Sequence, residues 1–202
     1  MHFSAIFGSV LAPLAAATSH SGCAPCKSSQ IEFASTFKQP EPPRIKHEFT
    51  ASFVQHKWNV NLSHITQGYI TNAASKGFVA VNQANEDGLS LSFFDYKNVT
   101  KEGLVDNTLT TYRPNDKPQV WRGYVNSNFP IFQDDMLITS GAVYTGMVDR
   151  DFVGLVASWS IMYQGVIPVT TYVDNDNKLV GYDYFAPELR TRATTRFYNI
   201  KA

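Results

Sequence analysis

Cysteine is nearly absent from this chain. The only two cysteines, Cys23 and Cys26, form the motif CAPC, so no disulfide framework can stabilise the residues that follow. A thioredoxin-like redox motif needs a strand before it and a helix after it, and no strand pattern precedes this one. A zinc site needs four ligands, and His20 is the only other candidate nearby. In a secreted chain the remaining interpretations are a local disulfide and pairing with another subunit, as in a homodimer.

An excess of charge of one sign is also lacking. The 202 residues include 17 basic and 17 acidic side chains, so the formal net charge is zero. No global field would draw the protein to nucleic acid or to an anionic membrane surface. After the first 17 residues no segment approaches the roughly 18 consecutive apolar residues of a membrane-spanning helix. We therefore expect no nucleic-acid partner and no membrane span.

The common motifs of catalysis and metal binding are missing. The chain has no GxSxG nucleophile elbow, no HExxH helix and no phosphate-binding glycine loop. Asp174 and Asp176 begin like a calcium loop, but Leu179 and Phe185 replace its glycine and glutamate. Adjacent carboxylates such as Asp134 and Asp135 are typical of turns and helix starts, and a hydrolase would need such groups to assemble in space. The sequence predicts a non-enzymatic protein without a metal or cofactor.

The chain begins with a pattern typical of a secretory signal. Ala5 to Ala17 is an uncharged, mostly apolar run that ends in small residues, and it predicts a signal peptide over residues 1–17. Residues 18–46 are polar and broken by prolines, which indicates an N-terminal arm. Two sequons, at Asn61 and Asn98, lie in predicted loops and are expected to carry N-linked glycans on a secreted, extracellular protein.

Residues 47–202 are predicted to form a single antiparallel β domain. Phe49, Ala51 and Phe53 alternate with smaller or polar residues, as in a half-buried strand. Similar patterns occupy residues 66–72, 77–83, 89–93, 108–112, 119–126, 142–148, 155–164, 165–173, 178–185 and 193–200, with turn residues between most of them. Residues 128–137 lack a strand period and predict a helical turn that covers the sheet. The fold class is therefore all-β or β-rich, with one or two short covering helices.

The C-terminal block assigns side chains to faces. In residues 155–163 the odd-numbered positions, among them Trp159 and Tyr163, share one face. A turn at residues 175–176 would pair Val173 with Lys178 and Val169 with Tyr182. One face would then carry Ile167, Val169, Thr171, Val173, Val180, Tyr182 and Tyr184.

These residues also carry a family resemblance. The strand tryptophan Trp159, the Pro168–Val169 strand, the YDYF strand and the final TTRFYNI resemble the ependymin-related secreted glycoproteins. The resemblance implies the curved antiparallel half-barrel that those proteins share with the lipoprotein carriers LolA and LppX. It departs from the family in one respect, because this chain has no cysteine inside the domain.

The resemblance implies that the concave face binds a lipid or another apolar small molecule. The residues expected to line the cavity are Trp159, Tyr163, Val169, Tyr182, Tyr184, Leu91 and Phe93. The alternative interpretation is an extracellular structural or adhesive glycoprotein, in which the same side chains are ordinary core. An elongated apolar pocket in the sheet face distinguishes the first interpretation from the second.

Overall fold

A computed structural model describes residues 39–202, apart from residues 61, 87, 128 and 164. The predicted signal peptide, most of the predicted arm, both cysteines and the sequon asparagine at position 61 lie outside the described residues. Within the described part, no helix has the length and apolar character needed to cross a membrane.

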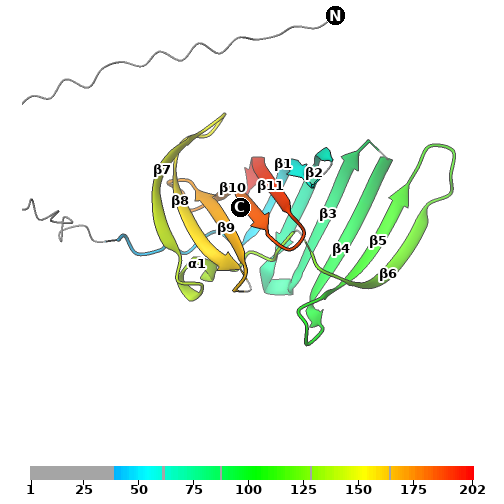
Figure 1. Cartoon of the computed structure of the whole chain (residues 1–202), viewed down its shortest axis with the longest axis horizontal. Helices are drawn as coiled ribbons and strands as arrows, with labels where there is room; N and C mark the ends of the chain where they lie inside the picture. Colours follow the sequence, from blue (N-terminus) through cyan, green and yellow to red (C-terminus); the bar gives the residue numbers. More distant parts are fainter. Residues whose placement is uncertain (1–38, 61, 87, 128, 164) are drawn as a thin grey trace, which may run out of the picture. The chain divides into compact units, whose positions relative to one another are not determined.

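The described residues form one open antiparallel sheet of eleven strands, curved into a half-barrel (Figure 1). The chain makes two meanders, β1 to β6 and β7 to β11, which join where β1 pairs with β11. The strands of the first meander are β1 (Glu48–Trp58), β2 (Ser63–Ala73), β3 (Phe78–Asn85), β4 (Gly88–Val99), β5 (Val105–Tyr112) and β6 (Gln119–Val125). Those of the second are β7 (Val143–Arg150), β8 (Gly154–Tyr163), β9 (Ile167–Val173), β10 (Leu179–Ala186) and β11 (Thr191–Lys201). The predicted all-β fold is therefore confirmed.

The connection between the two meanders determines how the concave face is filled. Strands β6 and β7 lie at opposite edges of the sheet, so residues 126–142, here called the crossing segment, must travel from one edge to the other. The segment carries the short helix α1 (Met136–Thr139), and a single 3₁₀ turn, η1 (Ala74–Lys76), follows β2. Phe129, Phe132 and Leu137 are buried against the sheet. The expected covering element thus exists, but most of it is irregular chain outside any helix or strand.

The main core lies between the concave face and the crossing segment. Phe49, Ala51 and Phe53 of β1 are almost fully buried there, as their alternation predicted. Phe132 packs against Phe49 and Tyr182, with ring centroids 6.2 and 5.5 Å apart. Because one segment touches strands from both meanders, the core is continuous across the half-barrel.

Two predictions about faces need correction. Val173 pairs with Leu179, and a bulge before Gly181 then brings Val169 opposite Tyr184 instead of Tyr182. The extra residue moves Val180 to the opposite face, where it packs with Val156 and Tyr172.

The second correction concerns β4. The concave side carries Ser90, Ser92 and Phe94, whereas Leu91 and Phe93 are 39% and 43% exposed on the convex side. The apolar alternation indicated a strand correctly, but its apolar side faces away from the core.

Candidate functional site

An apolar pocket opens on the concave face beside the second meander. Its volume is about 140 Å³. Strands β8, β9 and β10 contribute Ile161, Tyr163, Ile167, Val169, Tyr182, Tyr184 and Ala186, and the turn after β10 contributes Leu189. The crossing segment closes the opposite wall with Pro130, Phe132 and Met136. The pocket therefore exists because the crossing segment bridges the half-barrel without filling it completely.

Four of the seven residues predicted to line a cavity meet at this pocket. Tyr163, Val169, Tyr182 and Tyr184 are brought together by the pairing of β8 with β9 and of β9 with β10. Trp159 does not line the pocket; it is 3% exposed in the core, with its ring centroid 5.2 Å from that of Tyr144.

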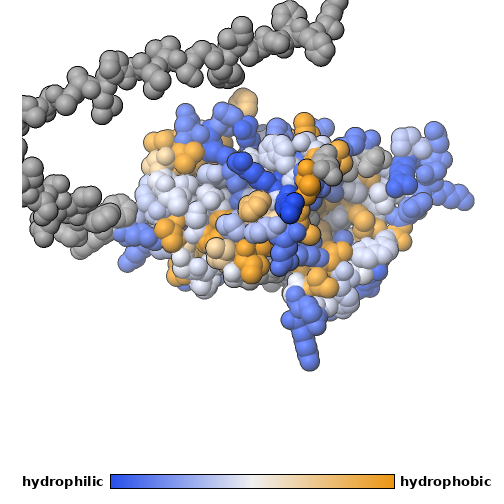
Figure 2. All heavy atoms as spheres, viewed as in Figure 1, coloured by the Kyte–Doolittle hydropathy of each residue, from blue (hydrophilic) through white to orange (hydrophobic). Residues whose placement is uncertain are grey.

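The other two predicted residues lie elsewhere. The convex side chains of Leu91 and Phe93 contact no part of this pocket, and the ring of Phe93 stacks on Phe78 with centroids 5.0 Å apart. Leu91 lines a shallow convex groove together with Tyr69 and Tyr198. In the view of Figure 2, orange apolar residues are interspersed with hydrophilic ones over the surface.

Burial changes the ionisation of the pocket tyrosines. It raises the pKa of Tyr184 to about 12 and also raises the pKa of Tyr163 and of Tyr182. The phenol groups are therefore neutral at physiological pH. Tyr163 and Tyr184 both line the pocket, and a phenol hydroxyl can donate a hydrogen bond to a bound molecule or accept one from it.

Lys57 gives the pocket a single charge. It lies near the end of β1, is half-buried, and is the only charged side chain among the described residues that line the pocket. Its position follows from the same alternation that buries Phe53 and Gln55 on the concave face. An ammonium group beside an apolar pocket favours a carboxylate or another anionic head group.

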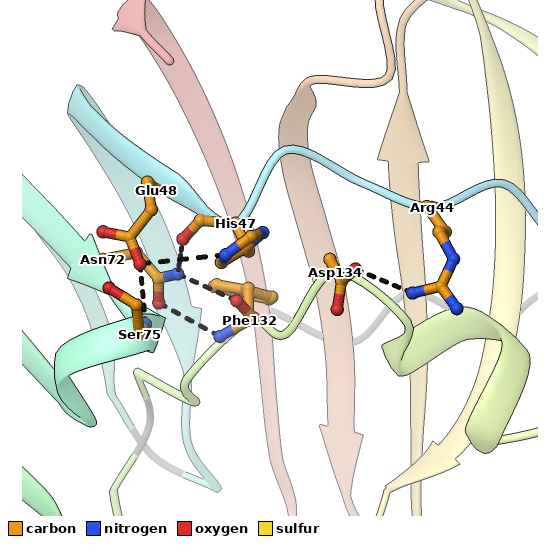
Figure 3. A network of polar contacts seen from close by, with 7 residues as sticks. All are labelled: Arg44, His47, Glu48, Asn72, Ser75, Phe132 and Asp134. Carbon is orange, nitrogen blue, oxygen red and sulfur yellow. Dashed lines mark hydrogen bonds and ion pairs between the residues drawn. The ribbon is translucent and has the colours of Figure 1, made fainter.

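A polar network holds the crossing segment near the start of β1 and the end of β2 (Figure 3). The side-chain amide of Asn72 donates to the carbonyls of His47 and Phe132 and accepts from the Phe132 backbone N–H. Arg44 and Asp134 form an ion pair of 2.7 Å, and the Ile45 N–H donates to the Asp134 carbonyl at 2.8 Å. The residues just before β1 thus hold the same segment that forms the pocket wall.

Sequence reasoning missed Phe132, Met136 and Lys57. The absence of a strand period in residues 128–137 was a signal that this segment covers the sheet, but it did not indicate which side chains would reach the pocket. Lys57 carried no signal, because a lysine near a strand end is normally solvated.

The described residues contain no cluster of three or more histidine, cysteine or carboxylate side chains that could hold a metal ion. The sequon asparagine Asn98 lies inside β4 and not in the predicted loop. Its Nδ2, the atom that glycosylation modifies, donates to Asp106 at 2.9 Å, and its Oδ1 accepts from the Tyr124 hydroxyl at 3.0 Å. Asn98 is exposed, and glycosylation there stays a prediction.

The fold and site together define an open antiparallel half-barrel with an apolar pocket under a crossing segment. No family model matches the chain, and a search of curated proteins found no match. Among solved structures, the chain is similar to a DUF1329 family protein from Desulfovibrio piger, with 11% identity and a TM-score of 0.33. The match covers 77% of this chain and 85% of that protein. At this level of similarity the match carries no argument about function.

Proposed function

We propose that this protein is a secreted, non-enzymatic carrier that binds the apolar part of a lipid or similar small molecule in the concave pocket. The observation that carries the proposal is the pocket between the crossing segment and strands β8 to β10, whose walls are mostly aliphatic and aromatic. An apolar pocket with a few placed polar groups is the usual form of a small-molecule site.

The size of the pocket limits what can enter it. A volume of about 140 Å³ is close to that of an engineered apolar cavity of about 150 Å³ that holds a benzene ring. The pocket is therefore suited to one ring or to a short stretch of hydrocarbon chain, and a longer chain would extend out of it.

The polar groups favour an amphiphile with an anionic head. Lys57 can pair with a carboxylate, and the hydroxyl groups of Tyr163 and Tyr184 can donate to its oxygens. No acidic side chain among the described lining residues would repel it. A fatty acid is accordingly the first ligand to test.

The test is a titration of the secreted protein with a fluorescent fatty acid, preceded by native mass spectrometry and organic extraction to identify copurifying lipid. Val169→Trp, which adds bulk inside the pocket, is expected to weaken binding at least about tenfold. Val120→Trp is the matched control, because Val120 is 69% exposed on β6 and lines no described pocket. No binding to the unmodified protein, or equal loss in both variants, would contradict the proposal.

The second candidate is an extracellular structural or adhesive protein without a ligand. It is favoured by the exposed apolar side chains of the convex side, including Leu91, Phe93 and Tyr198. Substituting these residues by serine would reduce self-association or adhesion if this candidate is correct, and would leave fatty-acid binding unchanged if the carrier is correct. Sedimentation velocity and the same titration distinguish the two.

A further inference from the structure

A second pocket on the concave face differs in character from the apolar one. It has a volume of about 430 Å³ and is lined by residues of β4 and β5. These are neighbouring strands of the first meander (Figure 1). Its polar walls are formed by Gln83, Ser90, Ser92, Asn107, Thr111 and Arg113. Phe94 and Phe129 provide an apolar floor. Hydroxyl and amide groups thus share this lining with apolar side chains, and Arg113 is the only charged residue among its described members.

One buried polar atom of this lining has no hydrogen-bond partner within the protein. Asn107 is 5% exposed, and its Oδ1 has no hydrogen-bond partner among the described residues. Buried polar atoms in native proteins are nearly always paired with protein, with water or with a bound molecule. A ligand that donates a hydrogen bond to Asn107 Oδ1 would satisfy this acceptor, whereas an apolar ligand would leave it unpaired.

The register of β4 and β5 spaces the polar groups for a small ring. Ser90 is directly opposite Thr111, so their β-carbons lie about 5 Å apart. Ser92 is two residues further along β4, about 7 Å away. A six-membered sugar ring presents hydroxyl groups over comparable distances, and each hydroxyl can both donate to and accept from serine, threonine or asparagine.

An aromatic side chain lies next to the pocket. Asn107 is opposite Gly123 on β6, and Leu109, which also lines the pocket, is opposite Trp121. The indole lies over Gly123, since a β-carbon there would be only 2.5 Å from Trp121 Cζ2. Trp121 is 48% exposed, so part of its ring is available to the C–H groups of a bound molecule.

From these observations we infer that the pocket over β4 and β5 binds a monosaccharide-sized polyhydroxylated group. This site is separate from the proposed fatty-acid pocket, with which it shares only Asn126 among the described lining residues. The shared chemistry is a set of sugar hydroxyls, which a free sugar and the head group of a glycolipid would both supply.

Ligand-observed NMR with methyl β-D-glucoside and methyl β-D-galactoside tests the inference. We expect saturable binding of at least one of them below about 10 mM. Asn107→Leu, which removes the acceptor, and Thr111→Val, which removes a hydroxyl, should each weaken that binding about tenfold or more. Thr110→Val is the matched control on the other face of β5 and should bind like the unmodified protein.

A further comparison separates the two sources of the sugar. Octyl β-D-glucoside, below its micelle concentration, should bind no more tightly than the methyl glucoside if the natural ligand is a free sugar, and more tightly if it is a glycolipid. Val169→Trp should leave methyl glucoside binding unchanged, whatever its effect on fatty acids. Absence of binding for both methyl glycosides, unchanged binding by Asn107→Leu and Thr111→Val, or loss in Val169→Trp would overturn the assignment.

Discussion

The side chain of Asn72 binds both backbone polar groups of Phe132. Its Nδ2 donates to the Phe132 carbonyl at 2.9 Å, and its Oδ1 accepts from the Phe132 N–H at 3.0 Å (Figure 3). Asn72 is 1% exposed, so these bonds are shielded from water. They take the place of strand pairing for a residue that crosses the sheet instead of joining it. This one side chain therefore helps to position the wall of the apolar pocket.

Replacing Asn72 by leucine should destabilise the protein strongly. The substitution leaves the Phe132 N–H and carbonyl buried without their partner, and each unsatisfied group costs about 1–3 kcal/mol. We expect the free energy of unfolding, measured by urea denaturation, to fall by about 2–4 kcal/mol. Asn82→Leu is the control, because Asn82 is exposed on the convex side of β3. Similar stabilities for the two variants would show that the Asn72 network contributes little.

Phe132 should contribute both to stability and to the shape of the pocket. Its ring is fully buried and packs against Phe49, Tyr182 and Phe197. Phe132→Ala is expected to lower the free energy of unfolding by about 3–5 kcal/mol. Phe152→Ala, at a fully exposed hairpin turn, should change it by less than about 0.5 kcal/mol. If the variant still folds, the enlarged pocket should favour bulkier fatty-acid probes; an unchanged preference would argue that Phe132 does not contact the ligand.

The charge of Lys57 should matter for one class of ligand only. Lys57→Met keeps the length of the side chain and removes its ammonium group. We expect fatty-acid affinity to fall about two- to tenfold while affinity for the matching fatty alcohol stays the same. Lys101→Met, in the exposed turn after β4, controls for the change in net charge. Equal effects on acid and alcohol would mean that Lys57 does not pair with the carboxylate.

The stability of the fold should depend on pH through Asp106, which lies on the convex side. Hydrogen bonds from Arg122, at 3.2 and 2.7 Å, hold the pKa of the Asp106 carboxyl below its ordinary value, and Asn98 lowers it further. Because the folded-state pKa is lowered, this stabilisation is fully present above the unfolded-state pKa of about 4. It is lost as the pH falls through the folded-state value.

Asp106→Asn should therefore be less stable than the unmodified protein at pH 7, and the difference should shrink towards pH 2. Urea denaturation at several pH values measures this difference directly. Asp116→Asn, in an exposed turn, has the same effect on net charge and should show a small difference at every pH. A difference for Asp106→Asn that stays constant with pH would rule out a contribution from its ionisation.

Local patterns were sufficient to predict the strands. Alternation in β1 predicted both its existence and its buried face, because a β-strand places successive side chains on opposite sides. In β4 the same reasoning failed at the second step, since Leu91 and Phe93 alternate as expected but face outwards. The stack of Phe93 on Phe78 covers part of the Phe93 ring without the core. An alternating pattern indicates that one face is apolar, and it does not say on which side the core lies.

The sequence by itself determined the all-β class, the succession of strands along the chain and most of their boundaries. These features depend on residues that are close together in the chain. Tertiary structure decided the pairing of β1 with β11 and the path of the crossing segment, which join residues far apart in sequence. It also decided both pockets. Tyr163, Val169 and Tyr184 could be placed on a common face from their spacing, but Lys57 and Phe132 join them only because the sheet curves and the crossing segment closes over it.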